Sequence, residues 1–419
     1  MGDLVRITRT TALGVLALGV VLCLTLGTLI AVMTKATGGV FAFLSLGPHD
    51  FAAIRFTLWQ ALASAALSTI FAIPVARALS RRQFRGRAAL ITLLGAPFLL
   101  PVIVAIVGLI AVFGRNGILN NGLNWAGLEP VSIYGFHGVI LAHVFFNLPL
   151  AVRFILQGWL AIPSERFRLA ASLNAPIGRV LEIPMLRAVV PSTFLVIFLI
   201  CLTSFAVALT LGGGPKSTTV ELAIYQALRF DFDLGRAAML ACLQFELCAV
   251  AAVIAWRVTG ADAMGAGFDR TVARWDMRRP VLDYLAIVLA ALFLLIPLGM
   301  VVLRGLPGLF EMPSSVWLAA FRSVCVAIGS AALCCTMAVA LGLLGGCIVA
   351  VIGVLPLAAS GLVVGTGAFL IVYPFANPSD FALQVTMLVN ATLALPFVLR
   401  AISPAIVAVH ADYAQLAAS

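Results

Sequence analysis

The chain has 419 residues, of which 63% are hydrophobic and 10% are charged, and its formal net charge is +10. Soluble domains carry about 25% charged residues, and a soluble protein of this composition would expose large apolar patches and aggregate. The composition therefore excludes an ordinary soluble protein and predicts an integral membrane protein. The basic residues lie in short loops between apolar runs, where they set topology, so we expect no nucleic-acid partner.

A helix that crosses a membrane needs about 20 mostly apolar residues. The apolar runs are too long for membrane β-strands and lack their alternation of apolar and polar residues. The sequence therefore predicts an all-α membrane protein, a polytopic helical bundle with about ten transmembrane helices. The predicted spans are 12–33, 54–76, 88–113, 136–160, 190–211, 236–256, 281–303, 316–344, 347–372 and 382–408.

Arginine predicts the orientation of these spans. The loops 77–87, 161–189 and 257–280 are rich in arginine, and the intervening loops carry only one or two basic residues each. The positive-inside rule places the arginine-rich loops, and the N-terminus with them, in the cytoplasm. The first apolar run is too long for the core of a signal peptide and has no A-x-A cleavage site, so we interpret it as a membrane anchor.

The chain also contains an internal repeat. The pattern LP-x3-R-x15-LAAS occurs at 148–172 and again at 395–419, with the same spacing and no gap. Self-similarity of this kind indicates duplicated structural units. We predict two parallel repeats and assign 1–280, with the N-terminal anchor helix, to the first and 281–419 to the second.

The first copy contains the segment PSERFRLAAS. Pro163 stops the preceding helix, and Ser164 is a good N-cap followed by the acidic Glu165. The segment therefore predicts a short amphipathic cytoplasmic helix. One interpretation is a helix that lies on the membrane surface. The other is a docking helix for a partner, because small alanine side chains allow close approach.

At these residues the chain resembles the permease subunits of binding-protein-dependent bacterial ABC importers, which carry an EAA-x3-G segment followed by I-x-L-P in a cytoplasmic loop. Residues 168–170 correspond to EAA, Asn174 to the glycine and 181–184 to the final element. Arg168 and Gln415 replace the glutamate, and the spacer after Asn174 is shorter than usual. Asparagine, like glycine, tolerates a left-handed helix end.

A more specific resemblance is to the thiamine and thiamine pyrophosphate permeases. The stretches 55–68, 140–157 and 211–244 carry it, and the second half of the chain resembles them less. The resemblance implies a type I importer permease that moves thiamine or thiamine pyrophosphate across the bacterial inner membrane. Ferric-iron permeases share the fused layout and remain an alternative. A secondary transporter driven by an ion gradient is a further alternative, although inverted repeats would favour it and these repeats are parallel.

The resemblance also implies the partners. They are two copies of a cytoplasmic ABC ATPase, which would hold ATP and magnesium, a periplasmic thiamine-binding protein, and the lipid membrane. The stretch LGGGPKSTT at 211–219 is not a P-loop, because Thr210 and Pro215 stand where G-x4-G-K-[ST] requires glycine. We therefore expect the chain to bind no cofactor and to be a transport subunit rather than an enzyme.

Two EAA-like loops are the expected ATPase-docking sites. The resemblance implies a docking helix at about 164–174 and a second one that begins at Asp412. Their candidate residues are Ser164, Glu165, Arg166, Phe167, Arg168, Leu169, Ala170, Ala171, Ser172, Leu173 and Asn174 in the first loop, and Asp412, Tyr413, Gln415, Leu416, Ala417, Ala418 and Ser419 in the second. Fused permeases of this family continue through further helices after the second loop. The resemblance therefore implies that the second repeat is incomplete and that this chain is a fragment or a decayed product.

Three residues are candidates for the substrate pathway. An ionisable group inside the membrane, such as His143, is a functional candidate by default, and nearby Phe146 could hold a thiazolium by a cation–π contact. Glu246 lies within a predicted span and would favour a cationic substrate. The alternatives are an interfacial histidine with ordinary packed aromatics, and helix pairing by Glu246. No arrangement of residues indicates catalysis or a metal site.

Overall fold

The computed structural model describes residues 2–34, 46–95, 97, 100–214, 217–258, 280–345, 355–357 and 359–417. The regular structure of these residues is helical, and nine of their helical segments are long and apolar enough to cross a membrane. The predicted all-α membrane fold is therefore confirmed. Of the predicted span 347–372, the structure describes a shorter helix, α17 (Gly361–Val372), because residues 346–354 and 358 lie outside the described ranges.

The chain divides into two compact units. Unit 1 contains Met1–Asp50, Ala223–Ala252 and Met312–Ser419, and unit 2 contains Phe51–Leu222 and Val253–Glu311. This division describes packing rather than sequence duplication. The assignment of two repeats to 1–280 and 281–419 therefore stays a prediction.

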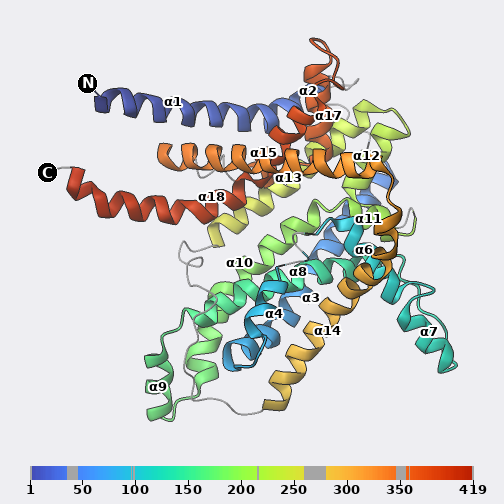
Figure 1. Ribbon diagram of the computed structural model, residues 1–419, viewed down its shortest axis with the longest axis vertical. Coiled ribbons are helices and arrows are strands. Elements are labelled where there is room, and N and C mark those ends of the chain that lie inside the picture. Colours follow the sequence, from blue (N-terminus) through green and yellow to red (C-terminus); the bar gives the residue numbers. More distant parts are fainter. Residues whose placement is uncertain are drawn as a thin grey trace. The chain divides into compact units, whose positions relative to one another are not determined.

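In unit 1, α15 (Ser314–Leu344) packs against both α1 (Gly2–Leu22) and α18 (Ala382–Ala417) (Figure 1). Alanine is frequent in their shared core, and small residues let membrane helices approach closely. The buried core residues are Ala17, Val21, Cys334, Met337, Ala338, Ala340, Leu341, Ala391, Leu395 and Leu399.

A π-helical turn, η1 (Cys23–Gly27), joins α1 to α2 (Thr28–Thr34), which packs against α17. A Cβ atom on Gly367 would lie 2.3 Å from the carbonyl oxygen of Thr28. This contact between α2 and α17 therefore requires glycine at position 367.

The beginnings of two helices are joined by a salt bridge in unit 1. Asp50, at the start of α3 (Pro48–Arg81), lies 2.8 Å from Arg236, at the start of α13 (Leu234–Val258). Asp50 also accepts a hydrogen bond from the backbone N–H of Gly47, and Asp233 accepts one from the N–H of Arg236. These carboxylates satisfy backbone donors that a helix start leaves without an intrahelical partner.

Unit 2 contains the remaining helices. They are the rest of α3, α4 (Arg87–Leu93), α6 (Val102–Phe113), α7 (Ile118–Trp125), α8 (Phe136–Leu160), α9 (Ser164–Ser172), η3 (Gly178–Glu182), α10 (Ile183–Leu202), α11 (Ala206–Leu211), the start of α12 (Val220–Arg229), the end of α13, α14 (Pro280–Gly305) and η5 (Pro307–Glu311). Helix α8 buries the largest side chains, including Phe145 and Trp159. Helix α10 packs against α8, and α14 packs against α6.

Two predicted spans of unit 2 are interrupted. Within the span predicted at 88–113, the structure describes two separate helices, α4 and α6. A turn follows α4 at residues 94–95, and Pro101 precedes α6 in an extended conformation with ψ of 130°. Proline lacks the N–H that would continue a helix. The span predicted at 190–211 is divided between α10 and α11, which are separated by residues 203–205.

A buried ion cluster joins the end of α3 to the start of α14. Arg82 Nε lies 2.8 Å from Asp283 Oδ2, and Arg81 Nη1 lies 3.5 Å from Asp283 Oδ1. The three side chains are at most 10% exposed. The sequence suggested only a topological role for these arginines. The structure shows that they also connect two helices that are distant in sequence.

Candidate functional site

The first predicted docking loop forms a short helix, α9, at one end of unit 2 (Figure 1). Its apolar residues divide between two faces. Phe167 and Ala170 are buried, whereas Leu169 is 60% exposed and Leu173 is 69% exposed. One face therefore attaches α9 to the rest of unit 2, and the other presents two leucines with Arg166 and Ser172 nearby.

The start of α9 differs from the prediction by one residue. Pro163 occupies the N-cap position with extended backbone angles, and the helix begins at Ser164. The hydroxyl of Ser164 donates a hydrogen bond to Glu165 Oε1 at 3.1 Å rather than accepting one from the backbone. Pro163 interrupts the helical conformation before α9, and its extended backbone leads directly into the first residue of that helix.

At the end of α9, Asn174 has the left-handed conformation that we expect of a residue in the position of the family's glycine. Asn174 has φ of 49°, in the left-handed region. The N–H of Ala175 donates to the carbonyl of Ala170 at 2.8 Å, and the N–H of Asn174 donates to that of Ala171 at 3.2 Å. These two bonds form a Schellman motif, which satisfies the last carbonyls of the helix.

Substitutions at Asn174 should therefore affect the end of α9 according to how readily the new residue adopts a positive φ. Asn174→Gly should keep the motif, because glycine adopts positive φ without strain. Asn174→Val should destabilise it by about 1–2 kcal/mol, which corresponds to roughly 5- to 30-fold faster amide exchange at 173–175. Hydrogen exchange measured by mass spectrometry in nanodiscs tests this. Equal exchange in the two variants would contradict it.

The segment that follows α9 is held by a bidentate ion pair that the sequence did not reveal. Arg77 of α3 donates to both carboxylate oxygens of Glu182, at 2.9 Å from Nε and 2.8 Å from Nη2. The Glu182 side chain is only 6% exposed. In the sequence, Glu182 is distinctive as the single acidic residue between Arg179 and Arg187. That position does not reveal Arg77 as its partner. The pair connects the final EAA-like element to the end of α3.

The second predicted docking loop lies at the end of α18. This helix is continuous from Ala382 to Ala417, so it contains Asp412, Tyr413, Gln415, Leu416 and Ala417 without a new helix start at Asp412. Ala418 and Ser419 lie outside the described residues. The first copy has Pro163 ahead of its helix, whereas the matching position in the second copy is His410, which does not interrupt a helix.

His143, predicted for the substrate pathway, is buried in a group of polar residues. Its Nδ1 lies 3.2 Å from Ser64 Oγ on α3, and its Nε2 lies 2.7 Å from Ser204 Oγ, in the break between α10 and α11. Asn147 donates to the carbonyl of His143, and Gln60 donates to the carbonyl of Cys201 at 2.8 Å. We call Gln60, Ser64, His143, Asn147 and Ser204 the polar break cluster.

The polar break cluster explains how unit 2 tolerates an interrupted membrane helix. A broken helix in a membrane persists where neighbouring side chains satisfy the freed backbone groups. Gln60 does this for the carbonyl of Cys201, near the end of α10. His143 joins α3 and α8 to the break itself. The sequence singled out His143 but missed the other four residues, because each is an ordinary polar residue within an apolar run.

The other two pathway candidates have different surroundings. Phe146 is half-buried and makes an edge-to-face contact with Phe145, with ring centroids 5.7 Å apart. Phe145 in turn contacts Phe293 of α14. Glu246 belongs to α13 in unit 1 and is exposed. Contact of any of these residues with a substrate stays a prediction.

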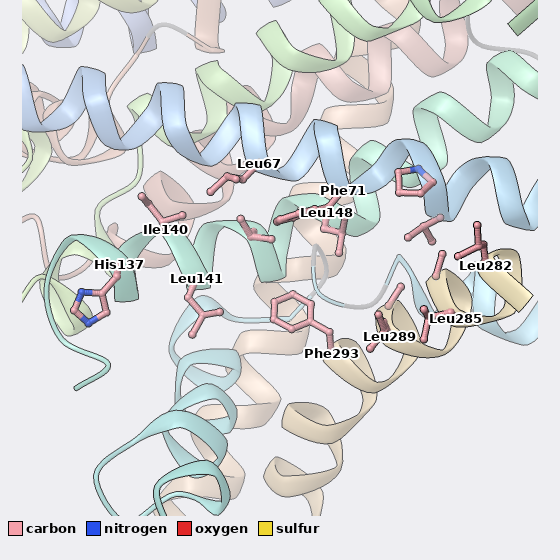
Figure 2. Close-up of a pocket in the computed structure, with 15 residues that line it drawn as sticks. Leu67, Phe71, His137, Ile140, Leu141, Leu148, Leu282, Leu285, Leu289 and Phe293 are labelled. Carbon is pink, nitrogen blue, oxygen red and sulfur yellow. The ribbon is translucent and has the colours of Figure 1, made fainter. Parts of the chain in front are cut away.

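Unit 2 contains an apolar pocket of about 550 Å³. Figure 2 shows residues that line it. Helices α3, α8 and α14 contribute its walls, through residues such as Phe71, Leu148 and Leu289. Among the described residues that line it, His137 is the one ionisable residue, and its ring is hydrogen bonded to the carbonyl of Ser132. Sites for polar ligands need several well-placed polar groups, so this pocket does not suit a charged vitamin.

Known proteins resemble the chain over most of its length. No protein-family model matches it. The chain is 36% identical over 427 aligned residues to the thiamine transport system permease protein ThiP of Salmonella typhimurium, which covers 97% of this chain and 80% of that protein. It is 39% identical over 389 residues to ThiP of Escherichia coli, which covers 87% of this chain and 72% of that protein.

Among solved structures, the chain is similar to a bacterial ABC transporter involved in the import of the acidic polysaccharide alginate. The TM-score is 0.43 and the identity 18%, over 56% of this chain and 89% of that one. This TM-score is too low for the solved structure to support a conclusion about the chain. The sequence identities to the two ThiP proteins are sufficient, and they confirm the family expected from the sequence: the chain belongs to the family of thiamine transport system permease proteins.

Proposed function

We propose that this chain is the membrane-spanning subunit of an ABC importer and that it carries thiamine or thiamine pyrophosphate across the bacterial inner membrane. The identity to ThiP of Salmonella typhimurium over 97% of the chain is the observation that carries the proposal. The nine apolar helical segments found in the described residues are consistent with a multi-pass transport subunit. In this proposal the N-terminus and the arginine-rich loops face the cytoplasm.

ATP hydrolysis belongs to partner subunits in this proposal. Two copies of a cytoplasmic ABC ATPase would bind the two EAA-like loops, and a periplasmic thiamine-binding protein would deliver the substrate. The exposed leucines of α9 support a docking role for the first loop, because Leu169 and Leu173 present apolar surface next to polar side chains. For the second loop, the support is the sequence repeat.

The polar break cluster is the proposed border of the substrate pathway. Polar groups within a membrane span are costly and are often kept at transport sites. Closing and opening of the ATPase subunits would move α9 and the segment linked to α3 by the Arg77–Glu182 pair. A shift of α10 relative to α8 would then change the contact of His143 with Ser204.

Substrate-stimulated ATPase activity tests this function. The chain is reconstituted in proteoliposomes with its ATPase, and thiamine-loaded binding protein is added from the outer side. We expect ATP hydrolysis to rise several-fold, and we expect no rise with a ferric-iron-binding protein. An ATPase variant that cannot hydrolyse ATP provides the background. Failure of the ATPase to co-purify, or stimulation by ferric iron alone, would contradict the proposal.

A further inference from the structure

Helix α7 (Ile118–Trp125) separates its apolar and polar residues cleanly. Its sequence is ILNNGLNW. At 100° per residue, the large apolar side chains fall within one half of the helix circumference, and the three asparagines fall in the other half. The apolar half contains Ile118, Leu119, Leu123 and Trp125, and the polar half contains Asn120, Asn121 and Asn124.

Helix α7 differs from a surface helix of a soluble protein, because it buries an asparagine and exposes large apolar side chains. Asn120, on the polar side, is fully buried and donates to the carbonyls of Gly114 and Val131, both at 2.9 Å. Its Oδ1 accepts from the N–H of Val131 at 2.8 Å. On the apolar side, Trp125 is 92% exposed and Ile118 is 51% exposed. Asn120 thus attaches α7 to the protein, Asn121 and Asn124 are exposed, and the large apolar residues Ile118, Leu119 and Trp125 point outward.

The exposed apolar surface continues into the loop that follows α7. Leu128, Val131 and Tyr134 are each about half exposed. Together with the outward apolar residues of α7 they are a set of large exposed apolar residues between positions 118 and 134, which we call the α7 face. Apolar patches of this kind are covered by a membrane or a partner.

We infer that the α7 face lies in the membrane–water interface, with Trp125 at the level of the lipid headgroups. The candidate membrane segment Val102–Trp125 contains both α6 and α7. Only residues 114–117 separate the two helices, so α7 forms the end of that segment. In Figure 1, α7 extends away from α8 and α14. Helices that lie in this interface bury an apolar face that carries tryptophan and leucine.

The chemistry of the α7 face favours lipid over a protein partner. None of the eight residues of α7 is charged, whereas docking surfaces for proteins commonly use charges to steer and orient the partner. Tryptophan and tyrosine are enriched at membrane interfaces because their rings are amphipathic. Trp125 and Tyr134 supply both types on this face. The charged residues nearest in sequence, Arg115 and Glu129, flank the helix and are exposed, where they can reach headgroups or water.

Tryptophan quenching in nanodiscs tests this placement without any transport assay. The chain has six tryptophans, so the signal of Trp125 is obtained as the difference between the unaltered chain and Trp125→Phe. The 92% exposure of Trp125 means that this change should not disturb folding. We expect phospholipids brominated near the headgroup to remove most of the difference signal. Lipids brominated near the chain end, and aqueous iodide, should remove much less.

Two matched variants test whether lipid contact belongs to the α7 face rather than to the polar side of the helix. Ile118→Ser should reduce the quenching of Trp125 by shallow bromolipids, whereas Asn121→Ser, on the exposed polar side, should not. Strong quenching by iodide with none by bromolipids would overturn the inference. Protection from iodide only after addition of a thiamine-binding protein would also overturn it, in favour of a docking surface. The proposed transport function could hold or fail independently of either result.

Discussion

Asp283→Asn should destabilise unit 2 by about 3–5 kcal/mol, the usual cost of removing one partner from a buried ion pair. Asp283 is the carboxylate that faces both Arg81 and Arg82 at the junction of α3 and α14, and all three side chains are nearly buried. Asparagine preserves the size of the side chain but removes its charge. Two guanidinium groups would then lose this carboxylate while staying out of water.

The measurement is the free energy of unfolding in a denaturing detergent titration, followed by circular dichroism. Asp380→Asn is the matched control, because Asp380 is exposed and exposed substitutions usually change stability by less than about 0.5 kcal/mol. Asp283→Glu keeps the charge and should recover part of the loss. If Asp283→Asn unfolded at the same detergent fraction as Asp380→Asn, the ion cluster would have no stabilising role.

Leu169→Ser should weaken binding of the ATPase subunit by roughly 30-fold, which corresponds to about 2 kcal/mol, the threshold of an interface hot spot. This expectation rests on the proposed function. Leu169 is 60% exposed, so the change should leave the stability of the chain nearly unaltered. Leu173→Ser should act in the same way, because Leu173 lies four residues further along the chain and is also exposed.

Titration of the ATPase onto the chain in nanodiscs gives the dissociation constant directly. Leu128→Ser is the matched control: this leucine is 58% exposed but lies in a loop predicted to face the opposite side of the membrane. The Leu128→Ser chain should bind the ATPase with the same dissociation constant as the unaltered chain. Unchanged binding by Leu169→Ser and Leu173→Ser would contradict the docking role of α9 and would favour the other interpretation that the sequence allows, a helix on the membrane surface.

Some features of the site could be predicted because they depend on a few neighbouring residues. The left-handed conformation of Asn174 is one example, since asparagine at a helix end tolerates positive φ and the structure has φ of 49° there. The beginning of α9 was predicted to within one residue from Pro163 and Ser164. The family was also recognisable, because short motifs and their spacing survive in the linear sequence.

Other features depend on pairing between distant segments, and local sequence does not encode that. Arg77 and Glu182 are 105 residues apart, and Arg82 and Asp283 are 201 residues apart. The sequence therefore showed these arginines only as positive charges in a loop. The break after Leu202 was missed for the same reason, because the residues that compensate for it, Gln60 and His143, lie on other helices.

By itself, the sequence determined that this protein is a helical membrane protein, that it contains a recurring EAA-like segment, and that it resembles a thiamine permease. These properties follow from apolar run length, helix-end chemistry and motif spacing, which are all local along the chain. Only the tertiary structure decided which side of each amphipathic helix faces outward. On α9 it buries Phe167 and exposes Leu169, and on α7 it buries Asn120 and exposes Trp125. The periodicity of a helix shows that it has two faces, but the packing partners decide which face is covered.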